Sequence, residues 1–113
     1  ISTSDRPSRV AVCHCMDCRK HHGSVFYAAA IFPKAAVSIN GATGVWKERH
    51  FCPICGSSVF AVTDTEIELY LGTLDAPDQF EPDYESWILR REKWLPEFDL
   101  HHRYILNRET DQE

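Results

Sequence analysis

The chain has 113 residues, of which 43% are hydrophobic and 26% are charged, and its net charge at pH 7 is −5. This length predicts one domain, residues 1–113, large enough to bury its own core. The acidic balance argues against nucleic-acid binding, which needs a basic surface. No apolar run approaches the roughly 18–20 residues of a membrane span, and we expect no membrane partner. The start does not resemble a signal peptide, so we expect a cytoplasmic location.

The first third of the chain carries two strand signals around a short polar segment. Residues 9–12 alternate like a short strand that runs into a group of cysteines. Residues 18–23 are polar and basic, which suits a helical turn or a loop. Residues 24–32 are nearly continuously apolar and end at Pro33, which favours a buried strand, although periodicity alone does not exclude a helix.

The middle of the chain carries a turn signal and two further strand signals. Residues 40–44, Asn-Gly-Ala-Thr-Gly, predict a hairpin between residues 37–39 and 45–49. Residues 58–62 are predicted as a strand. Residues 66–71 alternate most clearly, with Ile67, Leu69 and Leu71 facing a core and Glu66, Glu68 and Tyr70 facing away from it.

The last part of the chain gives weaker signals. Residues 87–95 are compatible with either a strand or a helix, and the polar residues 107–113 are expected to fray. Together the elements predict a mostly β fold, with small sheets and turns that carry metal ligands.

One cysteine pair has the form of a zinc knuckle. Cys52-Pro-Ile-Cys55 places two thiolates around a tight turn, and the following Gly56 supplies backbone freedom that lets amides point at sulfur. Because the five cysteines are an odd number in a chain with no secretory start, metal binding is favoured over a disulfide framework.

The other three cysteines, Cys13, Cys15 and Cys18, lie within six residues. Three thiolates can occupy one face of a zinc ion and leave its fourth position open, as catalytic sites do. The alternative is one closed site made by Cys15 and Cys18 with Cys52 and Cys55, in which Cys13 takes no part. Spacing alone does not separate these two hypotheses.

Three polar residues beside the triplet are candidates for supporting roles. Arg19 and Lys20 follow Cys18 directly, where they could offset the negative charge of a thiolate site or hold a substrate carboxylate, or simply form a solvated surface. His14 lies between two ligands, so its ring is expected to point away from the metal.

Three segments resemble one known family. Cys-His-Cys-x2-Cys-Arg-Lys-x2-Gly-Ser-x-Phe at 13–26, Phe-Cys-Pro-x-Cys-Gly-Ser at 51–57 and Gly-Thr-Leu-Asp at 72–75 look like the glutathione-dependent formaldehyde-activating enzyme (GFA) family, which includes centromere protein V. The resemblance implies a zinc-binding, mostly β fold related to the Rab-accessory zinc proteins (Mss-like).

The resemblance also implies two zinc sites. Cys13, Cys15 and Cys18 would form the active site, and Cys52 and Cys55 would form a structural site with an early Cys-x-Cys. No Cys-x-Cys precedes Val10 in this sequence, and residue 1 is not Met. We therefore expect that a short N-terminal segment precedes Ile1 in the full protein, and that the structural site is only half present here.

The activity implied by the resemblance joins glutathione to formaldehyde and gives S-hydroxymethylglutathione, so that the reverse reaction is that of a carbon–sulfur lyase. A small thiol and a small aldehyde are the expected partners, and zinc is the expected cofactor. The alternative hypothesis is a non-catalytic zinc module that binds a protein partner, because a shared fold does not fix function.

Overall fold

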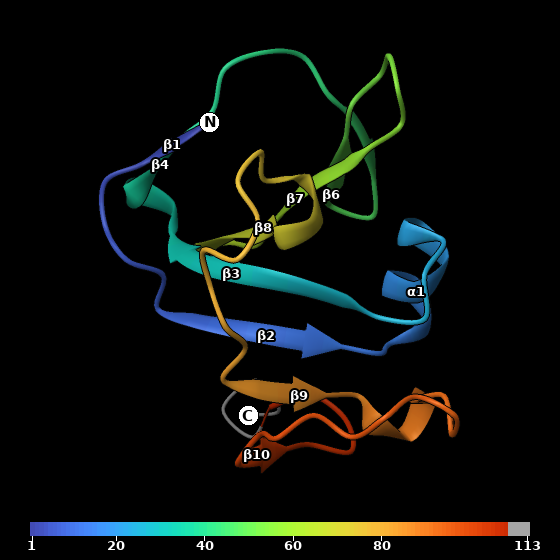
Figure 1. Ribbon diagram of the computed structural model, residues 1–113. Coiled ribbons are helices and arrows are strands. Elements are labelled where there is room, and N and C mark those ends of the chain that lie inside the picture. The colour runs from blue at the N-terminus through green and yellow to red at the C-terminus, as the bar shows by residue number, and fades with distance from the viewer. Residues whose placement is uncertain (109–113) are drawn as a thin grey trace.

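The alternating segments of the sequence form mostly strands. The computed structural model describes residues 1–108, and within them the chain forms ten strands, one α-helix and three 3-10 turns (Figure 1). In chain order these are β1 (Ser2–Thr3), β2 (Arg9–Cys13), α1 (Met16–His22), β3 (Tyr27–Pro33), η1 (Lys34–Ala36), β4 (Val37–Ser38), β5 (Gly44–Trp46), β6 (Arg49–Phe51), β7 (Ser58–Val62), β8 (Glu66–Tyr70), η2 (Leu71–Thr73), β9 (Tyr84–Ser86), η3 (Ile88–Arg90) and β10 (His102–Arg103).

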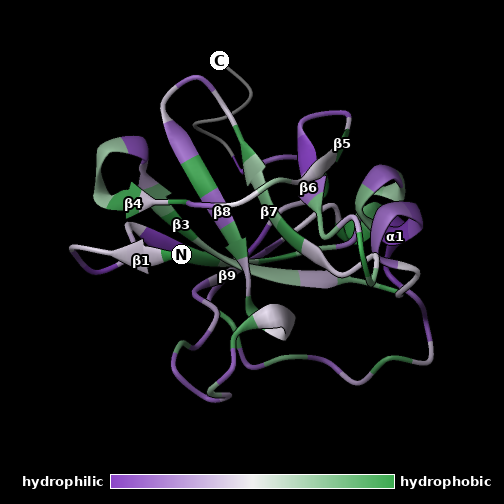
Figure 2. Ribbon diagram, turned by 90° about the horizontal axis from the view of Figure 1, so that it is seen from above, coloured by the Kyte–Doolittle hydropathy of each residue, from purple (hydrophilic) through white to green (hydrophobic). Residues whose placement is uncertain are grey.

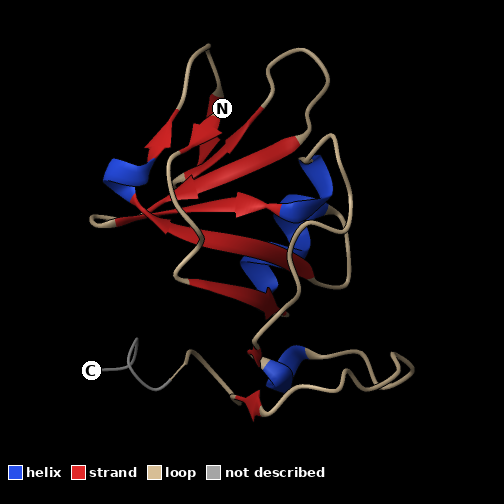
Figure 3. Cartoon of the chain, turned by 60° about the vertical axis from the view of Figure 1, so that its left-hand side comes forward, coloured by secondary structure: helices blue, strands red, loops and turns tan. Residues whose placement is uncertain are grey.

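The strands form one mixed sheet of eight strands and one small pair. The order in the large sheet is β10-β9-β2-β3-β8-β7-β6-β5, and β1 pairs with β4. Neighbours from β2 to β5 are antiparallel, whereas β9 is parallel to β2 and β10 is parallel to β9. Figure 3 shows the strands stacked side by side, with the C-terminal segment below them. The predicted mostly β class is confirmed.

Successive side chains on the central strands point to opposite faces of the sheet. In Figure 2, β8 changes between purple and green along its length, which follows the predicted alternation. One face carries the main hydrophobic core, made of Val10, Ala30, Phe32, Phe60, Ile67 and Leu69. The predicted core positions Ile67 and Leu69 are therefore confirmed.

The other face of the sheet is more polar but is also covered. Five residues form one row across it in direct register: Arg9, Ile31, Glu68, Ala61 and Arg49. Tyr70 lies on the same face as Glu68 and is only 3% exposed, because the rings of Tyr27 and His22 pack against it. The alternation of β8 was thus predicted correctly, but Glu66 and Glu68 are half-buried and Tyr70 is buried, so its second face is not a fully solvated surface.

The hairpin predicted at 40–44 is wrong. Strand β4 pairs with β1, and the hairpin forms instead between β5 and β6. Its two-residue turn is Lys47-Glu48, with φ angles of 46° and 65°. Positive φ at both positions is the requirement of a type I′ turn, which matches the twist of the flanking strands even without glycine.

The other expectations have simple outcomes. Strands β2, β3 and β7 overlap the strands predicted at 9–12, 24–32 and 58–62. Residues 87–95 form the short turn η3 and then a loop. Most of the tail expected to fray, 109–113 of 107–113, lies outside the described residues. Within residues 1–108 the longest helix, α1, has seven residues, too few to cross a membrane.

Candidate metal centre and cavity

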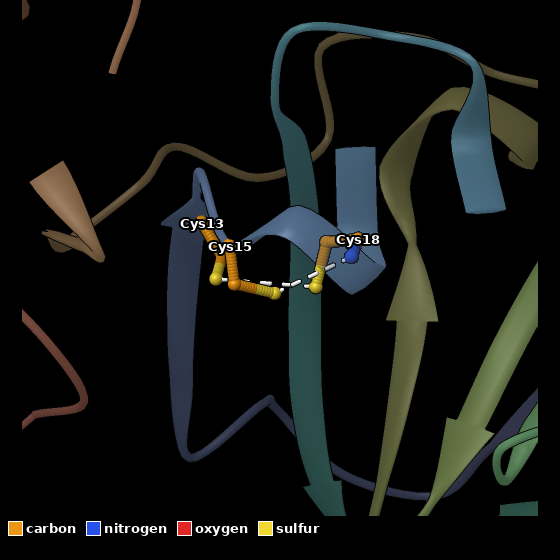
Figure 4. Close-up of side chains that lie close together, drawn as sticks. All are labelled: Cys13, Cys15 and Cys18. Carbon is orange, nitrogen blue, oxygen red and sulfur yellow. Dashed lines mark hydrogen bonds between the residues drawn. The ribbon is translucent and has the colours of Figure 1, made fainter. Parts of the chain in front are cut away.

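The three clustered cysteines come from the end of β2 and the start of α1 (Figure 4). Cys13 is the last residue of β2, Cys15 caps the N-terminus of α1, and Cys18 lies in its first turn. The Cys15 backbone is extended, and its Sγ accepts a hydrogen bond from the Cys18 backbone N–H at 3.4 Å. This is the arrangement of a helix N-cap, with sulfur in the place of the usual oxygen. The cap therefore turns the sulfurs of Cys15 and Cys18 toward the same point.

The three sulfurs have the spacing that a zinc ion requires. All three lie within 4.8 Å of one another, and the Sγ atoms of Cys13 and Cys18 are 4.0 Å apart. In a tetrahedral site with Zn–S bonds of about 2.3 Å, the sulfurs are about 3.8 Å apart. Cys13 and Cys18 are buried and Cys15 is half-buried. The donor set and its geometry fit a zinc ion bound by three thiolates.

The three thiols change one another's pKa. Contacts with the thiols of Cys13 and Cys18 lower the pKa of Cys15, because both neighbours donate to its sulfur. The pKa of Cys13 is raised by its contact with Cys15 and by burial, and the pKa of Cys18 is raised by its contacts with Cys13 and Cys15 and by burial. Thiols that bind a metal ion lose their protons, so this group would bind zinc as thiolates.

One cation, Arg49, lies against the cluster. Its Nη2 donates to Cys18 Sγ at 3.6 Å, and its Nη1 donates to the Lys47 carbonyl at 2.9 Å. Three thiolates and a dication carry a net charge of −1, so a permanent guanidinium at this position stabilises the site. Sequence reasoning missed Arg49, because no local pattern links the β5–β6 turn to the cysteines.

The turn between Cys13 and Cys15 is fixed from the other side of the sheet. His14 and Glu85 are both fully buried, and their Nε2 and Oε2 atoms are 2.6 Å apart. Glu85 also accepts hydrogen bonds from Arg91 Nε at 2.8 Å and from Arg103 Nε at 3.1 Å. His14 therefore faces a carboxylate and not the cysteine sulfurs, as expected, and the structure adds Glu85, which sequence reasoning did not find.

The three cysteines open onto a cavity of about 390 Å³ above the polar face of the sheet. Residues of that face line it together with Arg49, among them Arg9, Ala11, Tyr27, Glu68, Tyr84 and Ser86. The short side chain of Ala11 lines the cavity and leaves space that a larger residue would fill. The cluster thus lies on the wall of a cavity that could hold a small molecule.

The second cysteine pair lies apart from this cluster. Cys52 and Cys55 follow β6 in a tight turn, in which the Gly56 N–H donates to the Cys52 carbonyl at 2.8 Å and Gly56 has φ +80°. The backbone amides of Cys55 and Ile54 point at the Cys52 sulfur and lower its pKa. Among residues 1–108, the group of ligand atoms close enough to share a metal contains Cys13, Cys15 and Cys18 and neither residue of this pair.

Arg19 and Lys20 do not line the cavity that contains the three cysteines. Arg19 donates to the Arg90 carbonyl at 2.7 Å and to Glu92 Oε1 at 2.6 Å, so it joins α1 to the η3 segment. Lys20 is exposed beside it. A role of either residue in holding a substrate carboxylate stays a prediction, and the cations that do line the cavity are Arg9 and Arg49.

The comparison with protein families gives one match. The model of the family "Glutathione-dependent formaldehyde-activating enzyme" matches residues 1–90, which include all five cysteines, Arg49, Glu68 and Glu85. A comparison with curated individual proteins gave no match. The matched region covers most of the chain. This chain therefore belongs to the glutathione-dependent formaldehyde-activating enzyme family.

Proposed function

We propose that this protein is a zinc-dependent enzyme that joins a small thiol to a small aldehyde. Glutathione or a similar thiol and formaldehyde or another small aldehyde are the substrates, and in the reverse direction the enzyme is a carbon–sulfur lyase. The observation that supports this most is the position of three metal-spaced thiols on the wall of a cavity. A purely structural site is closed by four protein ligands, whereas this group supplies three.

Cys13, Cys15 and Cys18 would hold the zinc ion. When bound, zinc lowers the pKa of a thiol beside it, so that a thiolate is available near neutral pH. Arg49 offsets the negative charge that a further thiolate brings to the three cysteines. The buried His14–Glu85 pair keeps the Cys13–Cys15 turn in place. The cavity then holds thiol and aldehyde at close range, where orientation supplies much of the rate.

The other ligand and location proposals follow from the same chemistry. Cys52 and Cys55 would hold a second, structural zinc ion if a Cys-x-Cys precedes Ile1 in the full protein, and would be empty or partly occupied otherwise. Arg19 and Lys20, outside the cavity lining, would hold a carboxylate of the thiol substrate. Five free cysteines suit a reducing compartment, which supports a cytoplasmic location.

The proposal is tested by metal analysis and cobalt spectroscopy. We expect the purified protein to contain zinc, and the cobalt-substituted protein to show thiolate charge-transfer bands that change when glutathione is added. Cys15→Ser should remove the glutathione-sensitive band, whereas Cys55→Ser should leave it in place. A single cobalt site that uses four cysteines and ignores glutathione would contradict the enzyme and favour a zinc module for a protein partner.

A further inference from the structure

A second chemical group of the cavity is the carboxyl of Glu68. Glu68 lies at the middle of β8, and its direct neighbours in the sheet are Ile31 and Ala61, which offer no polar side chain. Its Oε1 accepts a hydrogen bond from the Tyr27 hydroxyl at 3.0 Å. Among residues 1–108, no Lys or Arg forms an ion pair with it. Glu68 is thus a half-buried carboxyl that accepts a hydrogen bond from the Tyr27 hydroxyl.

Glu66 shows what an ordinary structural carboxylate looks like in the same strand. It lies two residues earlier, on the same face, and Arg9 donates to both of its oxygens at 2.7 and 2.9 Å. Such a bidentate pair stabilises the charged carboxylate and fixes the positions of both side chains. Glu68 has no such partner, although an apolar residue between Ile31 and Ala61 would be less costly to bury. A half-buried carboxyl that has no ion-pair partner and lines a cavity is typical of a functional residue.

Tyr27 connects this carboxyl to the cysteines. It is the direct neighbour of Cys13 across the β2–β3 pair, and its hydroxyl reaches Glu68 in the row that also contains Arg49. Arg49 in turn contacts the sulfur of Cys18. Cys13, Cys18, Tyr27, Arg49 and Glu68 all line the same cavity. A molecule that fills it would lie between the sulfurs and the carboxyl.

We propose that Glu68 is the acid–base residue of the thiol–aldehyde addition and that Tyr27 positions its carboxyl. The inference rests on the proposed function and adds a proton-transfer residue to it. The Glu68 carboxylate takes the proton of the incoming thiol, and the sulfur electron pair forms the new bond to the carbonyl carbon. The π pair of the carbonyl moves to its oxygen, which then receives the proton from Glu68. The carboxylate is restored, and no proton is gained or lost overall.

The charges around Glu68 suit this exchange. Burial raises its pKa most strongly, and the Tyr27 hydrogen bond and the positive charges of Arg9 and Arg49 lower it, so that the pKa stays above its ordinary value. Glu66 on the same strand raises it further, and the nearby Tyr84 hydroxyl hydrogen-bonds to Arg9. A carboxyl whose pKa is shifted toward neutrality gives up and takes back a proton more readily than an exposed one.

The test compares three variants with the wild type. NMR exchange spectroscopy measures the rate at which the thiol–aldehyde adduct forms, and the uncatalysed rate is subtracted. Glu68→Gln should lower kcat by about 10²- to 10⁴-fold, the usual contribution of general acid–base catalysis. Its zinc content and the glutathione response of its cobalt form should match those of the wild type. The control is Glu97→Gln, which changes an exposed carboxylate that does not line the cavity and should change kcat less than threefold.

The pH profile provides a second readout, which a structural role would not change. Tyr27→Phe removes a hydrogen bond that favours the charged carboxylate, so the acid limb of kcat/KM should move to higher pH. In Glu68→Gln this limb should disappear. An active wild type whose Glu68→Gln variant keeps more than a third of its kcat would overturn this inference alone. A wild type that binds zinc and accelerates no thiol–aldehyde addition would overturn the proposed function and this inference with it.

Discussion

Removal of the buried Glu85 carboxylate should destabilise the protein more than any single surface change. Glu85 accepts hydrogen bonds from Arg91 and Arg103 and contacts His14, and both Glu85 and His14 are 0% exposed. In Glu85→Ala, Arg91 and His14 lose their acceptor inside the protein. Loss of one partner from a buried charge pair costs about 3–5 kcal/mol. The free energy of unfolding of a domain of this size is about 5–15 kcal/mol, so Glu85→Ala would remove a large share of it.

The assay is thermal and urea denaturation at pH 7, followed by circular dichroism. At about 4 °C per kcal/mol for a chain of this length, Tm should fall by about 12–20 °C. The control is Glu92→Ala, which removes the part-exposed ion pair with Arg19 and should cost about 0.2–1 kcal/mol. A loss in Glu85→Ala no larger than that of the control would refute the reasoning.

Because of the same carboxylate, we expect the stability of the folded protein to depend on pH. Burial tends to raise the pKa of Glu85, but hydrogen bonds from Arg91, His14 and Arg103 outweigh it and leave the pKa below its ordinary value. A carboxyl with a lowered pKa stabilises the folded state above its unfolded pKa, about 4.3. That stability is lost as the pH falls through the folded value. The stability difference between wild type and Glu85→Gln should therefore be largest near neutrality and should narrow below about pH 4.

Three further substitutions test other parts of the structure. Ala11→Leu should fill the cavity and abolish glutathione binding, measured by cobalt spectroscopy, while zinc content stays unchanged. Gly44→Ala should destabilise the protein by about 1–3 kcal/mol in urea denaturation, because a methyl group there overlaps the Phe51 ring. Glu48→Gly should raise stability by about 0.5–1 kcal/mol in the same measurement, because Glu48 has φ 65° in the turn, where glycine is unstrained.

Local patterns in the sequence were enough to predict several of the strands and the metal-spaced thiols, but not β1, β9 or β10. The alternation of β8 and the apolar run of β3 each depend on neighbouring residues alone, and both became strands. The triplet Cys13, Cys15 and Cys18 was also local, because six residues contain all three ligands. The hairpin predicted at 40–44 was wrong because β4 pairs with β1, far away in the chain.

The groups that surround the thiols could not be predicted in this way. Glu85 lies 71 residues from His14 and Arg49 lies 31 residues from Cys18, so only the sheet order brings them together. Arg19 was a plausible local cation, but its side chain is used by Arg90 and Glu92. The charge balance of the site therefore depends on topology, which a single sequence does not reveal.

The two-sided sheet has a consequence for how this protein tolerates mutation. Along β2 and β8, adjacent residues point to opposite faces of the sheet. Val10 and Leu69 pack in the hydrophobic core, whereas Ala11 and Glu68 face the cavity. In a saturation library, a screen for soluble expression should restrict the positions that face the hydrophobic core. A screen for adduct formation should restrict the alternate positions, which face the cavity. Turnover could then be evolved on one side of the sheet while folding is conserved on the other.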